Sequence, residues 1–230
     1  MRNSILAGFF IGIASFVYLN VGGVIGALGF SLGLVLVCMF STNLFTVEAG
    51  AVDLKSELGK LFGVILVGNF IGCIITAGIC SIPVISDVVG ESLRKTLETR
   101  YSTTILEAIS KAIMCGVIID CIVYAYKKTK NVVPVLLGVP AFILCGFYHS
   151  IADCFYYALG FFYDIKTYYA MAASPYIGAP DYIPGLQYLE NYMIKAGDNW
   201  YNAPVLIWIS SIIGNFIGCN MRKVVYKEVE

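Results

Sequence analysis

Charged residues and histidines are scarce in this sequence of 230 residues. Only 13% of the residues are charged and 59% are hydrophobic, whereas about 25% are charged in ordinary soluble domains. This composition excludes a disordered chain and disfavours a soluble two-domain protein. The 15 basic and 15 acidic residues balance, so no net positive field draws nucleic acid. The single histidine makes a histidine-built metal site nearly impossible, and we expect neither metal nor cofactor.

The cysteines show no spacing typical of a metal site or a disulfide scaffold. None of the eight forms a C-x-x-C pair, and all lie in or beside apolar runs. The chain is also longer and more hydrophobic than disulfide-stabilised domains usually are. We therefore interpret the cysteines as small buried hydrophobic residues.

Long apolar runs between the charged residues predict membrane-spanning helices. A span needs roughly 20 apolar residues. The first run, 3–47, is long enough for two spans and divides at the turn-like stretch 19–23. The further spans are expected in 61–86, in 101–126 (which carries three charges), in 131–152 with its continuation 154–163, and in 199–221. We predict an all-α integral membrane protein with six transmembrane helices in a single domain, 1–230.

The distribution of basic residues predicts the orientation in the membrane. Cytoplasmic loops carry an excess of Lys and Arg. With both termini in the cytoplasm of a cell-membrane protein, the inside segments hold nine basic residues and the outside segments five. The longest connection, about 164–201, then forms an extracellular cap. The inside set is Arg2, Lys55, Lys60, Lys127, Lys128, Lys130, Arg222, Lys223 and Lys227; the outside set is Arg94, Lys95, Arg100, Lys166 and Lys195.

A repeated hexapeptide divides the chain into two halves. Gly-Asn-Phe-Ile-Gly-Cys occurs at 68–73 and at 214–219, in the third and the sixth expected spans. Three spans per half is an odd number, so the second half enters the membrane from the opposite side. This is an inverted 3+3 repeat, which many transport proteins use. We expect repeats at about 1–88 and 100–225; a chance match among glycine-rich helices is the alternative.

Polar residues interrupt the second and the fifth expected spans. Residues 41–46 are followed by Glu48, and residues 146–150 are followed by Asp153. Irregular backbone at membrane depth is tolerated only where it is buried in protein or lines a cavity. The pattern therefore predicts two broken helices, and an in-plane axis would bring Thr46 and His149 together near the midplane.

His149 is the strongest functional candidate, because ionisable groups inside spans usually have a function. It can donate a hydrogen bond or a proton to a permeating anion. The alternative is a neutral histidine satisfied by a backbone carbonyl. Thr46 supplies a hydroxyl that donates or accepts, unless it bonds back to its own helix. Asn69 and Asn215 carry amides that can brace the broken segments.

Glu107 and Lys111 lie four residues apart on the fourth expected span and so face the same side. They form either a mutually neutralising pair at a helix contact or a functional feature. In the second interpretation Lys111 faces a vestibule and attracts anions.

Several of these segments resemble the formate/nitrite transporter family. Residues 29–34 and 44–46 resemble its second span and Ω loop. Residues 146–152 look like its fifth-span signature, G-F-x-H-S-I-A. Residues 68–72 and 214–218 are similar to its G-N-x-x-G elements. These segments cover four of the six expected spans, in the order of the family.

The resemblance implies an aquaporin-like fold, a homopentamer in the lipid bilayer with one pore per subunit, and passage of small monovalent weak-acid anions. Such anions are formate, nitrite, hydrosulfide and short carboxylates. The family usually has a lysine about three turns before a glycine, here Gly116; this chain has Thr104 there. By position, Leu34, Phe45 and Val123 line an inner apolar constriction, Leu44 and Phe142 an outer one, and Thr46, His149 and Asn215 the space between.

The expected mechanism is passive or proton-coupled conduction. Apolar rings strip water from the anion, which is costly for a full charge, and His149 shares or donates a proton. Return of the proton makes the protein a channel, and its co-transport makes the protein a symporter. An enzyme is not expected, because one histidine and no clustered cysteines offer no catalytic set. A channel for neutral solutes such as water or glycerol is the alternative.

Overall fold

The computed structural model describes residues 1–53, 55–172 and 204–226, and in these ranges the chain is helical without strands. The first half contains α1 (Arg2–Val21), α2 (Gly23–Met39), α3 (Phe45–Glu48), α4 (Leu58–Lys60), the π-helix η1 (Leu61–Leu66) and α5 (Val67–Cys80). The second half contains α6 (Pro83–Tyr101), α7 (Ile105–Thr129), α8 (Val133–Leu144), α9 (Ser150–Ala172) and α11 (Pro204–Val225).

Some of the described helices have the length and composition of membrane-spanning segments. Three described stretches are long and apolar enough to cross a bilayer, namely Arg2–Val21, Leu58–Cys80 and Val205–Val225. The apolar helices α2 and α8 are shorter, with 17 and 12 residues, because each ends where polar residues interrupt its run. Helices α7 and α9 have 25 and 23 residues and carry charges.

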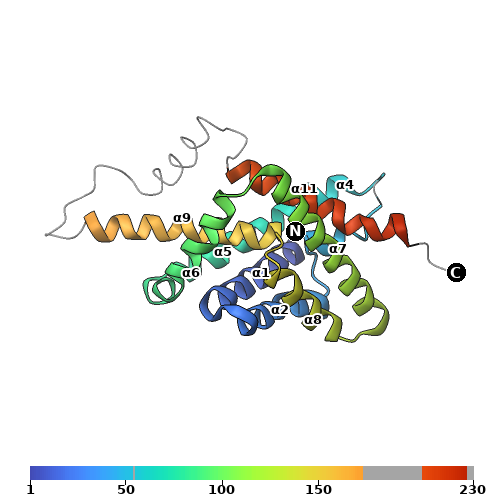
Figure 1. Cartoon of the computed structure of the whole chain (residues 1–230), viewed down its shortest axis with the longest axis horizontal. Coiled ribbons are helices and arrows are strands. Elements are labelled where there is room, and N and C mark those ends of the chain that lie inside the picture. Colours follow the sequence, from blue (N-terminus) through green and yellow to red (C-terminus); the bar gives the residue numbers. More distant parts are fainter. Residues whose placement is uncertain (54, 173–203, 227–230) are drawn as a thin grey trace.

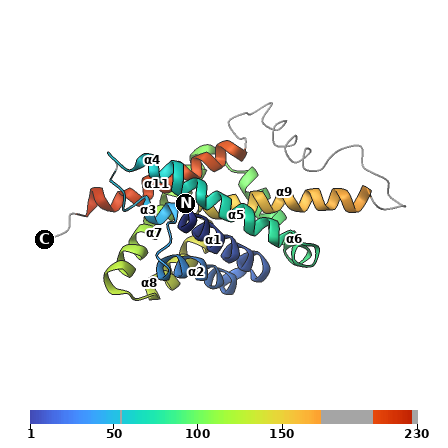
Figure 2. The same ribbon diagram turned by 180° about the vertical axis from the view of Figure 1, so that it is seen from behind.

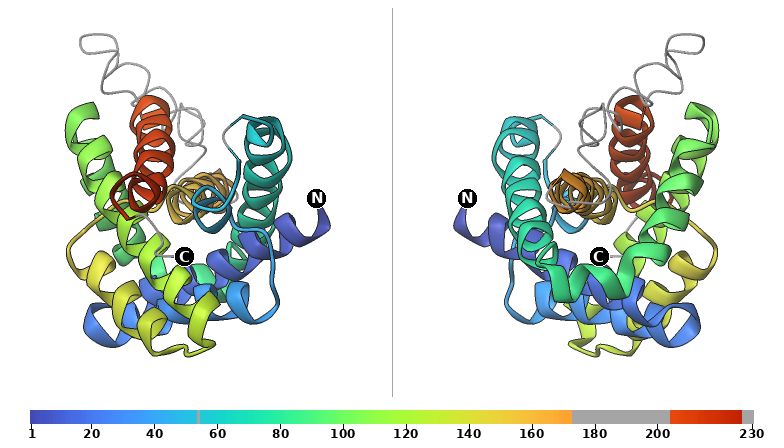
Figure 3. Two further views of the ribbon diagram at one scale, coloured as in Figure 1. Left: turned by 90° about the vertical axis from the view of Figure 1, so that its right-hand side faces the viewer. Right: turned by 90° about the vertical axis from the view of Figure 1, so that its left-hand side faces the viewer.

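Two groups of helices flank α9. Helix α1 packs against α2 and α5, and α7 packs against α11 and α8. Helix α9 contacts both α5 and α11, and Figure 3 shows it between them. Two broken segments, α2–α3 and α8–α9, therefore meet between the α1–α5 pair and the α7–α11 pair.

Glycines of the repeated hexapeptide allow the closest helix crossings. A Cβ at Gly72 would overlap the carbonyl oxygen of Ile5, so α5 lies against the backbone of α1. A Cβ at Gly218 would overlap the carbonyl oxygen of Ile113 in the same way, so α11 lies against α7. Small residues at such crossings let helices in a membrane approach closely.

The structure differs from the expected elements after the third and the fifth spans. The run expected to extend over 61–86 stops at Cys80, and the sequence analysis did not predict the helix α6 that follows. Helix α6 lies beside α9, as Figure 2 shows from behind. Helix α9 continues to Ala172, so residues 164–172 of the expected extracellular loop are helical. Residues 173–201 of that loop lie outside the described residues.

Helix α6 is amphipathic. Leu93 and Leu97 are buried, whereas Glu91, Arg94 and Lys95 form exposed ion pairs. Hydrogen bonds from Arg94 and Lys95 hold the pKa of the Glu91 carboxyl below its ordinary value. The charged face points away from the helices that α6 contacts, which explains why an amphipathic helix occurs between two apolar spans.

Candidate functional site

The two helix interruptions have the same backbone geometry. After α2, the Thr42 N–H donates to the Val37 carbonyl at 3.0 Å, and the residue before Thr42 has φ 50°. After α8, the Phe147 N–H donates to the Phe142 carbonyl at 3.0 Å, and the residue before Phe147 has φ 68°. A hydrogen bond from an N–H to the carbonyl five residues earlier, across a residue with positive φ, is a common helix end that satisfies one of the last carbonyls. Both interruptions are therefore formed helix ends followed by an extended segment.

Asn69 braces the first interruption with its whole amide. Its Oδ1 accepts the Phe45 N–H at 2.7 Å. Its Nδ2 donates to the carbonyls of Ser4, at 2.7 Å, and Asn43, at 2.9 Å. The bonds to Asn43 and Phe45 satisfy backbone groups of the extended segment that no helix satisfies, and the bond to Ser4 attaches the brace to α1.

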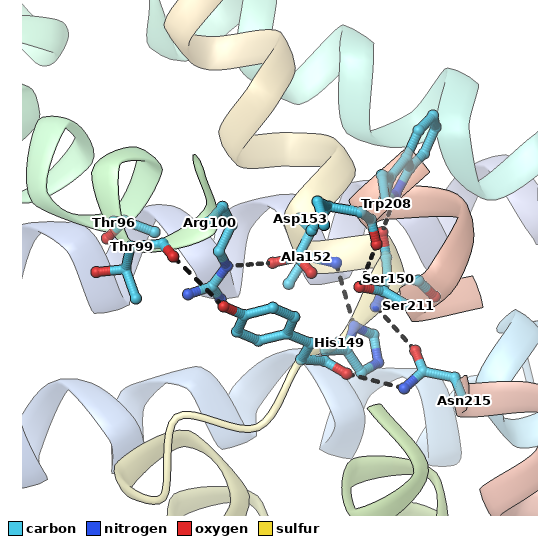
Figure 4. A network of polar contacts seen from close by, with 12 residues as sticks. Thr96, Thr99, Arg100, His149, Ser150, Ala152, Asp153, Trp208, Ser211 and Asn215 are labelled. Carbon is cyan, nitrogen blue, oxygen red and sulfur yellow. Dashed lines mark hydrogen bonds and ion pairs between the residues drawn. The ribbon is translucent and has the colours of Figure 1, made fainter. Parts of the chain in front are cut away.

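Asn215 repeats this arrangement at the second interruption. Its Oδ1 accepts the Ser150 N–H at 2.8 Å. Its Nδ2 donates to the carbonyls of Ala112, at 2.9 Å, and Tyr148, at 2.8 Å. Figure 4 shows Asn215 beside His149, near the start of α9. Both amide hydrogens are used, so neither is left to donate to a ligand.

Two cysteines of the hexapeptide connect the halves of the chain. The Cys73 thiol lies 3.3 Å from the Ile151 carbonyl in α9. The Cys219 thiol lies 3.1 Å from the Thr46 carbonyl in α3. Each thiol therefore reaches the broken segment of the other half. All eight cysteines are free. The interpretation of the cysteines as buried residues is confirmed for five of them and is wrong for Cys38, which is half-buried, and for Cys121 and Cys145, which are exposed.

Thr46 and His149 meet where the two broken segments converge. Thr46 Oγ1 lies 3.2 Å from His149 Nε2, and the two residues are 0% and 4% exposed. The Ala152 N–H donates to Nδ1 of His149 at 3.1 Å (Figure 4). Because a backbone N–H can only donate, Nδ1 accepts and the neutral ring carries its proton on Nε2, directed at Thr46. The expected contact is confirmed, and it places a hydrogen-bond donor at the junction.

Aromatic rings cover the junction on one side. The Phe142 ring stacks on the His149 ring, with centroids 6.0 Å apart and an angle of 17° between the planes. The Phe30 ring meets both rings edge-on, at 6.2 Å from Phe142 and 6.5 Å from His149. Phe142 and Phe30 are both buried, and the sequence pattern did not indicate Phe30.

A second group of aromatic side chains packs around Phe45, the residue before Thr46. Phe45 follows directly after the first interruption, and its ring lies 5.5 Å from Phe62, which lies 5.5 Å from Phe216. The remaining candidates for the constrictions, Leu34, Leu44 and Val123, are all buried in the core.

A cavity of about 330 Å³ reaches the His149 ring. Phe30 and Phe142 contribute to its walls. Lys95 and Arg100 of α6 also line it, so its described lining holds two cations. The described lining thus combines two basic side chains, aromatic side chains and His149.

The sequence profile of the formate/nitrite transporter family matches residues 1–226. The chain belongs to the formate/nitrite transporter family. The family consists of transporters and channels and not of enzymes, and the apolar helices agree with a multi-pass membrane protein.

Solved structures of this family share the fold. A pentameric formate channel with formate bound superposes with a TM-score of 0.73 at 24% identity, covering 97% of this chain and 93% of the other. An FNT family ion channel superposes with a TM-score of 0.61 at 18% identity, covering 95% and 84%. No curated protein gives a significant sequence match.

In this member of the formate/nitrite transporter family, Lys111 forms an ion pair on its own helix. Lys111 Nζ lies 2.6 Å from Glu107 Oε1, which agrees with the neutralising pair of the two interpretations. Lys111 is not part of the cavity lining. Thr104, at the position of the usual family lysine, caps α7 by accepting the Glu107 N–H at 3.3 Å.

Two ion pairs of this family member were not predicted. Arg100 pairs with Asp153 across 3.0 Å beside the cavity, and Arg222 pairs with Asp120 across 2.6 Å near the end of α11. The partners are 53 and 102 residues apart in sequence, a separation that periodicity and spacing do not reveal.

Proposed function

We propose that this protein conducts small monovalent anions of weak acids across the membrane. The family and the structurally similar formate channel support this class of cargo. The observation that carries the proposal is the Nε2–H of His149, directed at Thr46 at the base of a cavity that is lined by two cations.

The proposed architecture is six spans in two inverted repeats, with both termini in the cytoplasm of a cell-membrane protein. The equivalent amide braces of Asn69 and Asn215 support the repeat, as do the equivalent bonds over the two interruptions. The pentameric relative supports a homopentamer with one path in each subunit.

The proposed path runs from the cavity to the junction and on to the opposite side. Leu44 and Phe142, which are both buried, form the outer apolar constriction. Leu34, Phe45 and Val123 form the inner one. Asn215 borders the space between them, but we assign it to the brace because its amide hydrogens are bonded to the backbone.

In the proposed passage, hydrogen-bond donors of the protein replace the water around the anion. The apolar rings remove water from the anion, which is costly for a full charge. The Nε2–H of His149 and the hydroxyl of Thr46 then donate to the anion, and hydrogen bonds to charged groups are about twice as strong as neutral ones. The bond from Ala152 keeps Nδ1 unprotonated, so protonation of the ring on Nδ1 requires this bond to break. Hydrogen-bond sharing is therefore the proposed step, and proton co-transport requires rearrangement at Ala152.

A stopped-flow panel on purified protein in vesicles tests the function. Formate, nitrite, hydrosulfide and lactate are compared with glycerol. Fluxes that follow the weak-acid anions, with glycerol no faster than through empty vesicles, support the proposal. Glycerol passage without anion passage would establish the alternative channel for neutral solutes.

A further inference from the structure

We propose that Arg100 is an anion-binding residue and that its guanidinium selects planar oxyanions, namely carboxylates and nitrite. The inference deepens the proposed function and rests on it. It assigns the binding cation to the end of α6, whereas Thr104 at the start of α7 is occupied with capping that helix.

The Arg100 side chain is fixed in place before any anion arrives. It is 14% exposed, and its partner Asp153 is 2% exposed. The Arg100 Nε donates to Asp153 Oδ1 at 3.0 Å (Figure 4). The guanidinium carbon lies 4.4 Å from the centre of the Tyr148 ring and 5.8 Å from that of Tyr156. A side chain ordered in advance loses less conformational entropy on binding a ligand.

The binding edge of Arg100 remains available. Its ion pair with Asp153 uses Nε, and neither Nη1 nor Nη2 hydrogen-bonds to any of the described residues. Arg100 also lines the cavity that reaches His149. Two terminal nitrogens in one plane match the two oxygens of a carboxylate or of nitrite.

Asp153 holds Arg100 close to the contact between Thr46 and His149. Asp153 lies one turn after His149 in α9, and its N–H donates to the His149 carbonyl at 2.9 Å. The ion pair therefore places Arg100 near the cavity base rather than at the surface of α6. Lys95 also lines the cavity, and it is paired with Glu91 at 3.3 Å.

The geometry of guanidinium predicts selectivity among the anions. Formate, nitrite and short carboxylates present two oxygens and can accept both terminal N–H groups. Hydrosulfide presents one sulfur atom. The positive charge attracts it, but it cannot accept both terminal N–H groups in the geometry that a carboxylate offers. A lysine at the same place keeps the charge but loses the fork.

The test compares Arg100→Lys with Arg94→Lys in vesicles, using formate and hydrosulfide as probes. Arg94 lies on the same helix, but its side chain is exposed and does not line the cavity. We expect Arg100→Lys to lower formate flux by roughly tenfold, the effect of losing one charge-assisted hydrogen bond. Hydrosulfide flux should fall much less, and Arg94→Lys should leave both fluxes unchanged. Equal losses for both anions, or an unchanged formate flux, would overturn the assignment.

A second variant distinguishes a loss of anion binding from a loss of folding. Arg100→Gln alone leaves a buried carboxylate without its cation, which destabilises a protein strongly. The double variant Arg100→Gln with Asp153→Asn removes both charges together, and its elution volume on size exclusion reports folding. A folded double variant with wild-type formate flux would also refute the inference. If the wild-type protein passes no anion at all, the proposed function itself fails. If the wild-type protein conducts anions and the Arg100 variants conduct them equally well, only the role of Arg100 fails.

Discussion

Replacing Asn215 by alanine should destabilise the protein more than any other single loss of an amide in α11. The change removes three hydrogen bonds, to Ser150, Ala112 and Tyr148. A hydrogen bond contributes a net of about 0.5–1.5 kcal/mol, and side-chain bonds between membrane helices average about 0.6 kcal/mol. Three such bonds amount to about 2–4 kcal/mol. The Ser150 N–H at the start of α9 is then left buried without its partner, which favours the upper end of this range.

The assay is thermal unfolding of purified protein in detergent, with Asn220→Ala as the control. Asn220 lies on the same helix, and its Nδ2 donates only to the Phe216 carbonyl one turn before it, at 2.9 Å. Its removal should change the free energy of unfolding by less than about 1 kcal/mol. Asn69→Ala should resemble Asn215→Ala, because Asn69 makes the three equivalent bonds.

Two results would refute this reasoning. If Asn215→Ala unfolds at the temperature of Asn220→Ala, the amide does not hold the second interruption in place. If Asn69→Ala is neutral while Asn215→Ala is strongly destabilising, the two halves are not braced alike, and the case for an inverted repeat weakens.

Three further substitutions test the packing around the site. Gly72→Ala should lower the melting temperature by separating α1 from α5, whereas Gly78→Ala on the same helix meets only ordinary contacts and should be tolerated; equal melting temperatures would contradict the close crossing. Cys219→Ala should reduce anion flux more than Cys219→Ser, which keeps a donor for the carbonyl of α3, and the reverse order would exclude that role. Arg222→Gln should destabilise the protein by more than the roughly 0–1 kcal/mol expected for the exposed pair of Arg94, since its carboxylate partner is buried, and calorimetry showing equal effects would disprove this.

The sequence predicted the local features of the site well. Clusters of polar residues within apolar runs indicated both helix interruptions, because irregular backbone at membrane depth needs buried polar partners or a cavity. The repeated hexapeptide indicated two equivalent braces, and the contact between Thr46 and His149 follows from bringing the interruptions together. The spacing of Glu107 and Lys111 left two interpretations open, and the structure shows the ion pair.

The cation beside the cavity could not be predicted from the sequence. Helix α6 lies between two spans, where its charges resemble those of an ordinary loop, and Arg100 is out of register with the family lysine. Its function depends on Asp153, 53 residues later, and on the cavity that tertiary packing forms. Long-range pairs of this kind become visible only when the helices are placed in space.

Formate flux through His149→Leu in vesicles tests the central claim most directly. Leucine keeps the apolar volume but removes the Nε2–H at the junction, and a hydrogen bond to a charged group contributes about 1.5–3 kcal/mol. The account predicts a flux roughly 10- to 100-fold below wild type, with partial recovery in His149→Asn, which retains an amide donor. Wild-type flux through His149→Leu would contradict the account, because the anion would then cross without the imidazole.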